Sequence, residues 1–324
     1  MAVSYEYSIG SVRARETALF TKTDFEQLLG CTGTQELCQT LSDKGYGSVA
    51  AFDEMLDRHA QEVWRYLKSV APDMTVFHPF LLPTDAHNFK VTLKGIMAAR
   101  DYYKDLLLTP CTVAHDVIID AVEHRSMKAL PAWMQDAAGK AYDLLVHTGD
   151  AKASDAVLDK AVMEEMLQAA RAYRSDFLKE YFCTLVFYNN VKIALRGART
   201  GADAAYFRQA LAEDAGFHRD KIIAAAVKGE DALTDVLSKI RDYGCDKAME
   251  AYKASPTAFE KFADDRLMLL AKESCKRICE GAEPLLGYYL GEEAQKKALQ
   301  IIYSGVKTGA DTDTIRERLR EIYG

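Results

Sequence analysis

Apolar side chains recur along most of this chain with the three- and four-residue spacing of amphipathic helices. Three long segments show the pattern most clearly: Ala51–Val70, Asp155–Phe182 and Thr257–Glu280. Residues three and four apart share a helix face, so each segment has an apolar stripe that can be buried. No segment alternates apolar and polar residues between hairpin turns, as a β-strand would. The pattern therefore predicts an all-α fold.

One helical pattern occurs more than once. The segment NFKVTLKGIMAARD at Asn88–Asp101 aligns without a gap with NVKIALRGARTGAD at Asn190–Asp203. A third copy, ALQIIYSGVKTGAD, occupies Ala298–Asp311, and a weaker one, SVRARETALFTKTD, occupies Ser11–Asp24. Copies spaced by about a hundred residues indicate internal duplication of a unit the size of a small domain.

The positions shared by the copies have the chemistry of a helix end followed by a helix start. Glycine leaves a helix through a conformation that costs other residues more, and an aspartate accepts the free N–H groups that begin the next helix. Capping-box spacing also occurs at Thr23–Glu26 and Thr314–Glu317. We therefore predict structural caps at Gly95, Gly197, Gly201, Gly305, Gly309, Asp24, Asp101, Asp203 and Asp311.

The spacing of the copies also predicts how the chain is divided. It places helical repeats at residues 1–84, 85–187 and 188–290, followed by a half-repeat at 291–324. The first repeat is short, and the half-repeat copies only the opening of a unit. We expect the C-terminal helices to pack on the first repeat and complete it, so that three similar helical units close into one compact body.

Basic residues within two copies are candidate contacts at a repeat junction or with a partner. Lys90 and Lys94, like Lys192 and Arg196, place like charges one helical turn apart. Such a pair costs about a few tenths of a kcal/mol by itself, and its repetition suggests acidic neighbours across a repeat junction or on a partner. For any single residue, a solvated helix face is the simpler interpretation.

Three further polar or aromatic residues are candidate contacts. Asn88 and Asn190 occupy equivalent positions, and we expect them to bond to backbone or a neighbouring helix rather than to a ligand. Tyr46 lies in Gly30–Gly47, whose turn residues predict a loop between helices. Its ring is either an exposed contact or packed beneath that loop.

Composition narrows the class of protein. The chain has 324 residues, of which 49% are hydrophobic and 27% charged, as in soluble folded proteins. The formal net charge of −7 argues against nucleic acid or an anionic lipid surface as the main partner. No apolar run reaches the roughly 18 residues of a spanning helix, and the first residues lack the pattern of a signal peptide. We expect a cytosolic protein.

No segment has the pattern of a catalytic, cofactor or metal site. GVKTGA at residues 305–310 places its Lys and Thr before the second glycine, unlike a phosphate-binding loop. Asp120 and His124 are four apart, and we expect a local helix pair there rather than a general base. Seven scattered cysteines predict free thiols, and Cys275 with Cys279 lacks the second ligand pair of a metal site. We predict no catalytic residue, no cofactor and no metal.

The end of the chain resembles a known family. Glu283–Gly324 reads EPLLGYYLGEEAQKKALQIIYSGVKTGADTDTIRERLREIYG, which is similar to the closing signature of the C subunit of V/A-type rotary ATPases, a relative of the eukaryotic d subunit. The opening YSIGSVRARETALFTKTDFEQLL (Tyr7–Leu29) and FYNNVKIALRG (Phe187–Gly197) resemble it too. The first copy departs most, with Ser11 where two other copies carry Asn.

This resemblance implies a non-catalytic part of a central rotor. Members of the family are all-helical and funnel-shaped, with three similar domains. One end sits on the cytoplasmic face of the proteolipid ring, and the other holds the central stalk, made by the D and F subunits, so that torque passes between the catalytic head and the ring. The chain is then expected to be peripheral on the membrane through its complex, without inserting directly and without binding nucleic acid. The coupled ion, H⁺ or Na⁺, and the direction of ATP turnover stay open. An α-helical repeat scaffold that binds other soluble proteins is the alternative.

Overall fold

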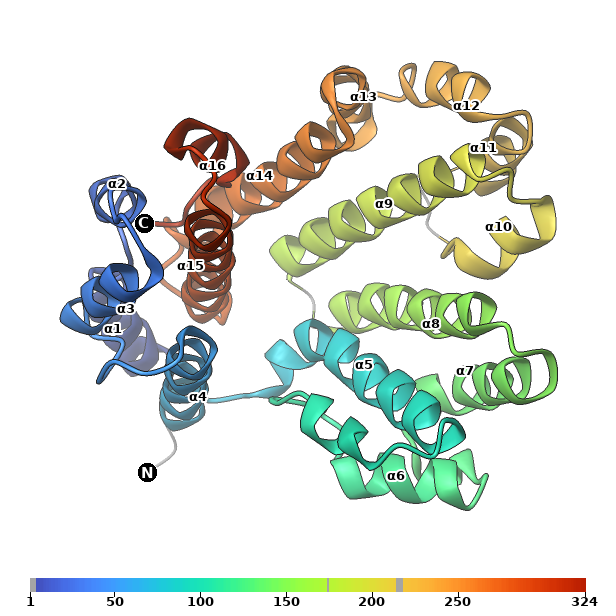
Figure 1. The fold of residues 1–324 in the computed structure, drawn as a ribbon, viewed down its shortest axis with the longest axis horizontal. Helices are drawn as coiled ribbons and strands as arrows, with labels where there is room; N and C mark the ends of the chain where they lie inside the picture. Colours follow the sequence, from blue (N-terminus) through green and yellow to red (C-terminus); the bar gives the residue numbers. More distant parts are fainter. Residues whose placement is uncertain (1–3, 174, 214–217) are drawn as a thin grey trace. The chain divides into compact units, whose positions relative to one another are not determined.

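The computed structural model describes residues 4–173, 175–213 and 218–324, and these form helices joined by short connections (Figure 1). No β-strand occurs in the described ranges, and the predicted all-α class is confirmed. Contacts between helices divide the chain into two compact units. Unit 1 combines Met1–Thr75 with Ala251–Gly324, and unit 2 is Val76–Glu250. The division into three repeats and the funnel shape stay predictions.

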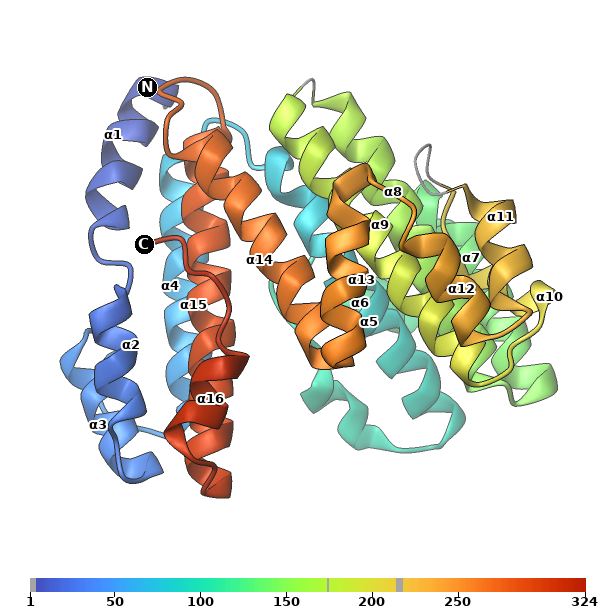
Figure 2. The ribbon, with the colours of Figure 1, turned by 90° about the horizontal axis from the view of Figure 1, so that it is seen from above.

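Unit 1 brings N-terminal and C-terminal helices together. Its helices are α1 (Tyr5–Glu16), α2 (Lys22–Leu29), α3 (Thr34–Asp43), α4 (Phe52–Val70), α14 (Pro256–Cys275), α15 (Glu283–Thr308) and α16 (Thr312–Arg318). The long helix α15 contacts α1, α4 and α14, and α16 contacts α2 (Figures 1 and 2). The C-terminal helices therefore lie beside the N-terminal ones within this unit.

The core of unit 1 explains why one predicted loop is a helix. The segment Gly30–Gly47 is expected from its turn residues to be irregular, yet α3 occupies Thr34–Asp43 within it. Leu37 and Leu41 are fully buried one helical turn apart, in a cluster with side chains of α2, α4 and α15. The prediction is wrong because burial of this short apolar stripe outweighs the turn preference of the glycines on either side of it.

Unit 2 is a layered helical array built around α8. Its helices are α5 (His78–Met97), α6 (His115–Glu123), α7 (Ala132–Asp143), α8 (Ala151–Ala172), α9 (Asp176–Arg199), α10 (Ala204–Ala210), α11 (Arg219–Ala226) and α12 (Glu230–Leu237). α8 packs against α5, α7, α9 and α10. Phe89, Ile118, Met134 and Leu158 are fully buried where α5 to α8 meet. The last helix of this part, α13 (Cys245–Ala254), crosses the boundary between the units in sequence.

Two predicted helices are shorter than their apolar patterns. Asp155–Phe182 is divided between α8, which ends at Ala172, and α9, which begins at Asp176. The side chain of Ser175 accepts a hydrogen bond from the Leu178 N–H at 3.2 Å and so starts the second helix. The helix predicted to reach Glu280 ends at Cys275.

Candidate functional site

The duplicated segments form three junctions between a long helix and the short element that follows it. Junction 1 joins α5 to the 3₁₀-helix η2 (Asp101–Leu106), and junction 2 joins α9 to α10, both in unit 2. Junction 3 joins α15 to α16 in unit 1. These junctions contain most of the residues that the sequence analysis singled out.

Each long helix ends in the same hydrogen-bonded turn. A backbone N–H beyond the helix returns to the carbonyl of the glycine shared by the copies. These bonds run from Arg100 to Gly95 (3.0 Å), from Ala202 to Gly197 (2.9 Å) and from Ala310 to Gly305 (3.0 Å). The preceding residue has a left-handed conformation, with φ of 50° at Ala99, 70° at Gly201 and 68° at Gly309. This is the Schellman arrangement, and it gives Gly201 and Gly309 the helix-exit role that their sequence suggested.

Junction 1 carries strain that the other two lack, because Ala99 stands where they have glycine. A left-handed conformation costs an L-residue about 1–2 kcal/mol. We expect Ala99→Gly to raise the free energy of unfolding by about 0.5–1 kcal/mol, after allowing for the greater freedom of glycine in the unfolded chain. Urea unfolding measures this. The control is Ala98→Gly at φ −86°, which gains nothing from glycine. Equal shifts in both variants would contradict the strain argument.

The earlier glycines of the junctions have a packing role instead of the exit role suggested by sequence. They lie inside the long helices, and a Cβ on each would collide with a side chain of the following element. The contacts are Gly95 with Tyr103 at 2.4 Å, Gly197 with Phe207 at 2.4 Å and Gly305 with Ile315 at 2.5 Å. These three large side chains are almost fully buried. The long helix therefore needs a residue without a side chain at that point, so that the short element can pack against it.

A buried asparagine fixes the chain that leaves junctions 1 and 2. Asn88 donates to the Leu108 carbonyl at 3.0 Å and accepts from the Leu108 N–H at 2.8 Å. Asn190 makes the same two bonds with Ala212, at 3.1 and 3.0 Å. Both asparagine side chains are fully buried. They therefore bond to backbone, and each serves as a two-point clamp on the segment after its short helix.

The third copy has alanine at the clamp position, and a residue that sequence reasoning missed acts nearby. Gln295, one turn before Ala298 on α15, accepts from the Phe20 N–H at 2.7 Å. Its amide also donates to the hydroxyl of Tyr46 at 2.8 Å. Gln295 thus ties two connections of unit 1 to α15. No copy pattern identifies it, because its partners lie more than two hundred residues away in sequence.

The aspartates begin helices in two different ways. Asp203 and Asp311 are N-cap residues that accept from backbone N–H groups three residues on, at 2.8 and 2.9 Å. Asp24 is instead the third residue of α2 and forms a capping box with Thr21. The boxes expected at Thr23–Glu26 and Thr314–Glu317 are replaced by these caps, because each helix begins earlier than the motif implies. Asp101 begins η2, and its side chain lies outside the described part of the chain.

The carboxylate of Asp24, which caps α2, makes the stability of the fold depend on pH. Hydrogen bonds from Lys44 and then Thr21 lower the pKa of Asp24 to about 2. Its folded pKa lies below the unfolded value of about 4, so the stabilisation is present above pH 4 and is lost as pH falls towards 2. We expect the free energy of unfolding in urea at neutral pH to be about 1–2 kcal/mol higher for wild type than for Asp24→Asn, after discounting for the partial exposure of the carboxylate. The difference should vanish near about pH 2, and a constant difference would contradict the pairing.

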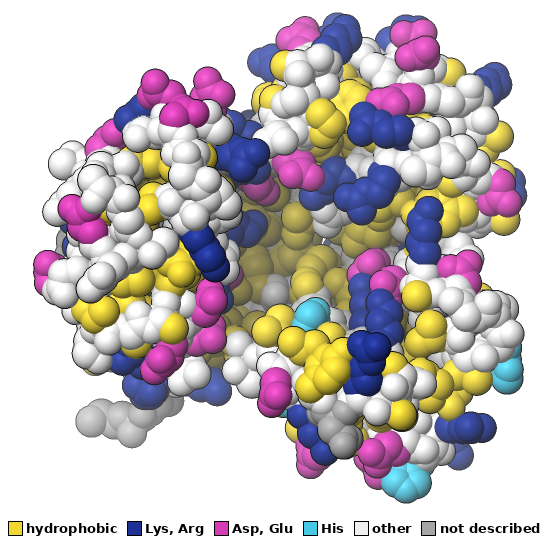
Figure 3. Space-filling view, in the orientation of Figure 1, with side chains coloured by type: hydrophobic (Ala, Val, Ile, Leu, Met, Phe, Trp, Pro, Cys, Tyr) yellow, Lys and Arg dark blue, Asp and Glu magenta, His cyan; other side chains and the backbone are white. Residues whose placement is uncertain are grey.

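The basic residues of α5 have acidic neighbours within unit 2. Lys90 pairs with Asp159, and Lys94 pairs with Asp155 at 2.7 Å, both across the contact with α8. These pairs compensate the like charges on α5, although partly exposed ion pairs contribute only about 0–1 kcal/mol each. On α9, Lys192 is half-buried and Arg196 is exposed. In the space-filling view, Lys and Arg side chains gather over α5, α8 and α9 (Figure 3).

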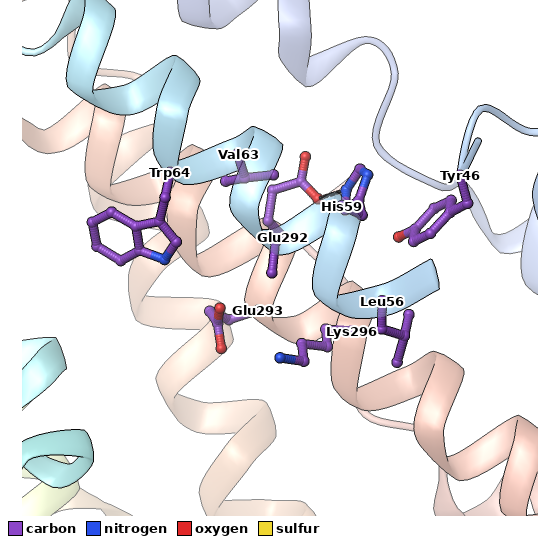
Figure 4. Close-up of a pocket in the computed structure, with 9 residues that line it drawn as sticks. Tyr46, Leu56, His59, Val63, Trp64, Glu292, Glu293 and Lys296 are labelled. Atoms are coloured by element: carbon purple, nitrogen blue, oxygen red, sulfur yellow. Dashed lines mark hydrogen bonds and ion pairs between the residues drawn. The ribbon is translucent and has the colours of Figure 1, made fainter. Parts of the chain in front are cut away.

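Tyr46 is packed beneath its loop and is not an exposed contact. Its ring is 4% exposed and stacks on His59, with ring centroids 4.1 Å apart. His59 in turn bonds to the Glu292 carboxylate at 2.8 Å, which links α4 to α15 (Figure 4). Burial raises the pKa of the Tyr46 hydroxyl. The small pocket here is completed by Leu56, Ala60, Val63, Trp64, Glu293 and Lys296.

The remaining candidates for chemistry have structural surroundings. Buried Asp85 accepts from the N–H groups of Thr112 and Val113, at 2.8 and 3.0 Å, and so holds the loop before α6. Asp120 and His124 form the expected local pair at 3.1 Å. Among the described residues, no three His, Cys, Asp or Glu side chains are grouped to hold a metal ion. The same part of the chain has no helix long and apolar enough to span a membrane.

Comparison with known proteins gives one consistent result. The family model described as ATP synthase (C/AC39) subunit matches residues 8–318. The C subunit of the V-type sodium ATPase of Enterococcus hirae is 19% identical over 320 residues, covering 96% of this chain and 97% of the relative. The C subunit of the A-type ATP synthase of Methanocaldococcus jannaschii is 22% identical, covering 97% and 86%. That of Methanobrevibacter smithii is 25% identical, covering 90% and 81%.

The family match includes all three junctions, the whole of unit 2 and most of unit 1, and the relatives align over most of their length. The C subunits of V/A-type ATPases are non-catalytic structural subunits, in keeping with buried polar groups that hold backbone and helix ends. This chain belongs to the ATP synthase (C/AC39) subunit family.

Proposed function

We propose that this chain is the central-rotor component that links the central stalk of a V/A-type ATPase to its membrane ring. In this role it receives the D and F stalk subunits and contacts the proteolipid ring on the cytoplasmic side. It transmits torque for ATP-coupled transport of H⁺ or Na⁺ and performs no catalysis itself. The observation that carries the proposal is the family match over residues 8–318, with relatives named as C subunits that align over most of their length.

The junction geometry supports a part that carries mechanical load. A helix end that is locked by side chains packed on bare glycine cannot slide without steric collision. The buried clamps of Asn88 and Asn190 hold the exits of two long helices at two points each. Close-packed interiors transmit strain instead of absorbing it. Such joints suit a protein that passes rotation from one partner to another.

One exposed surface supports association with a neighbouring subunit. Met97, Tyr102, Leu106 and Leu108 surround junction 1 and are 41–55% exposed. The position of Met97 corresponds to Arg199 and Lys307 at the other two junctions, so the fold does not require an apolar residue there. Grouped exposed apolar side chains are typical of protein interfaces. We propose that this surface contacts another member of the complex.

Affinity purification from gently solubilised native membranes tests the role. We expect the tagged chain to bring down the A and B head subunits, D, F and the proteolipid in near-stoichiometric amounts. Leu106→Ser with Leu108→Ser should lower that recovery, whereas Val227→Ser, another exposed apolar residue of unit 2, should not. Thermal melting of each variant shows that it is folded. Recovery with unrelated soluble proteins would overturn the rotor role and favour a helical scaffold.

A further inference from the structure

The segment that follows α16 has an extended backbone and lies along two helices of unit 1. Leu319–Tyr323, here called the strap, turns back from α16 and runs beside α14 and α15 (Figure 2). Its first residue has φ −64° and ψ 146°, which is extended backbone. The strap is held by side chains of α14 and by a hole in α15, and it has no helix or ladder of its own.

Side chains on one face of α14 bind the strap at four points. Lys261 donates to the Leu319 carbonyl, and Asp265 accepts from the Glu321 N–H at 2.6 Å. Two ion pairs follow, Arg320 with Asp264 at 3.1 Å and Lys272 with Glu321 at 2.7 Å. Asp264, Asp265 and Lys272 follow Lys261 by three, four and eleven residues, so all four side chains lie on one face of α14. Backbone and side-chain groups of the strap are therefore recognised together.

An aromatic anchor completes the attachment. Tyr323 is 1% exposed and fills a hole over Gly287 and Gly291, which are one turn apart on α15. A Cβ on Gly287 would lie 2.3 Å from the Tyr323 hydroxyl oxygen, and one on Gly291 would lie 3.0 Å from its Cβ. The ammonium of Lys276 lies 5.0 Å from the centre of the ring. The hole exists only because both positions are glycine.

We propose that the strap is a peptide bound in cis, and that its groove on α14 and α15 also accepts a separate segment with an Arg-Glu pair followed by an aromatic residue. The ion-paired side chains are 16–37% exposed, so salt weakens their attraction. Tyr323 in its hole, with Leu319 and Ile322 packed against the core of unit 1, then holds the segment. Because the strap has only five residues, its opening is local and costs less than global unfolding. An opened strap presents a built groove, and a partner segment of matching chemistry can take its place. This inference stands apart from the rotor role.

Hydrogen exchange of the full chain tests the opening step. We expect the strap to exchange well before the cores of α14 and α15, and faster at about 1 M salt than at about 0.1 M. Lys272→Glu should increase its exchange several-fold, and the swapped pair Lys272→Glu with Glu321→Lys should restore protection. Exchange of the strap only together with the helix cores, or no recovery in the swapped pair, would overturn the proposal.

Binding of a labelled peptide with the sequence of residues 318–324 tests the exchange step. Full-length Tyr323→Ala has an emptied hole, and we expect it to bind this peptide more tightly than wild type does. The same peptide with Ala in place of its tyrosine should not bind. If Tyr323→Ala does not melt cooperatively, Glu321→Lys takes its place, since it loosens the strap and leaves Lys272 of the groove unchanged. If a variant with a loosened strap is folded but does not bind the peptide, the proposal that the groove is a binding site is overturned.

Discussion

Asn190→Ala is expected to lower the free energy of unfolding by about 2–4 kcal/mol, because it leaves a buried N–H and a buried carbonyl without partners. Both groups belong to Ala212, which is itself fully buried. Urea or guanidinium unfolding at neutral pH gives the difference. The matched control is Asn189→Ala on the same helix at a half-buried position, where we expect a change within about 0.5 kcal/mol.

Asn190→Asp separates the clamp from simple packing. Aspartate keeps the size of the side chain and can still accept from the Ala212 N–H, but its ionised form cannot donate to the Ala212 carbonyl. Burial would raise its folded pKa above the unfolded value of about 3.9, so the destabilisation appears as pH rises above that value. We expect the deficit of this variant to shrink between about pH 7 and pH 4. Equal decreases in the free energy of unfolding for Asn189→Ala and Asn190→Ala would contradict the clamp. A deficit of Asn190→Asp that does not change with pH would contradict it too.

Gly197→Ala is expected to destabilise the chain by about 1–3 kcal/mol, because its Cβ would overlap the Phe207 ring in a packed core. In an unobstructed helix the same change stabilises by about 0.5–1 kcal/mol, since alanine favours helix. Gly139 on α7 is such a site, because a Cβ there would have no atom within 4 Å apart from its chain neighbours and the nearby backbone of its own helix. The two substitutions should therefore have opposite signs in the same unfolding experiment.

The steric cause of the Gly197 effect can be isolated with a second change. Phe207→Leu shortens the ring that meets the new methyl group, so it should cost less in the Gly197→Ala background than in wild type. Contacting residues usually couple by about 0.5–3 kcal/mol in such a cycle. Additive effects, or stabilisation by Gly197→Ala, would contradict the close approach of α10 to α9.

The internal duplication could be predicted from the sequence, but the partners of its shared residues could not. The copies indicated helix exits, and Gly201 and Gly309 have the required left-handed conformation. The same pattern predicts this role for Gly197, because a glycine near a helix end can serve either for helix exit or for close approach of another element. Only the position of Phe207, ten residues later, decides between them. Local pattern gives the conformational freedom of a residue and not what packs against it.

The hydrogen-bond partners of the clamps cannot be predicted from the sequence either, because a local pattern does not identify them. Asn190 was expected to bond to backbone or a neighbouring helix, yet its partner Ala212 is an apolar residue with no motif of its own. The copies do not point to Gln295, because the third copy has Ala298 at the equivalent position and its amide lies one turn earlier. The break at Ser175 was missed because apolar periodicity continues through it, while a single cap ends one helix and starts another.

Ion transport measured together with ATP hydrolysis, in membrane vesicles that carry the complex with and without this chain, tests the central claim most directly. A non-catalytic link between stalk and ring predicts that removing the chain leaves ATP hydrolysis by the head while ion uptake stops. Adding the purified chain back should restore uptake. Ion uptake that continues without the chain would contradict its role as the link.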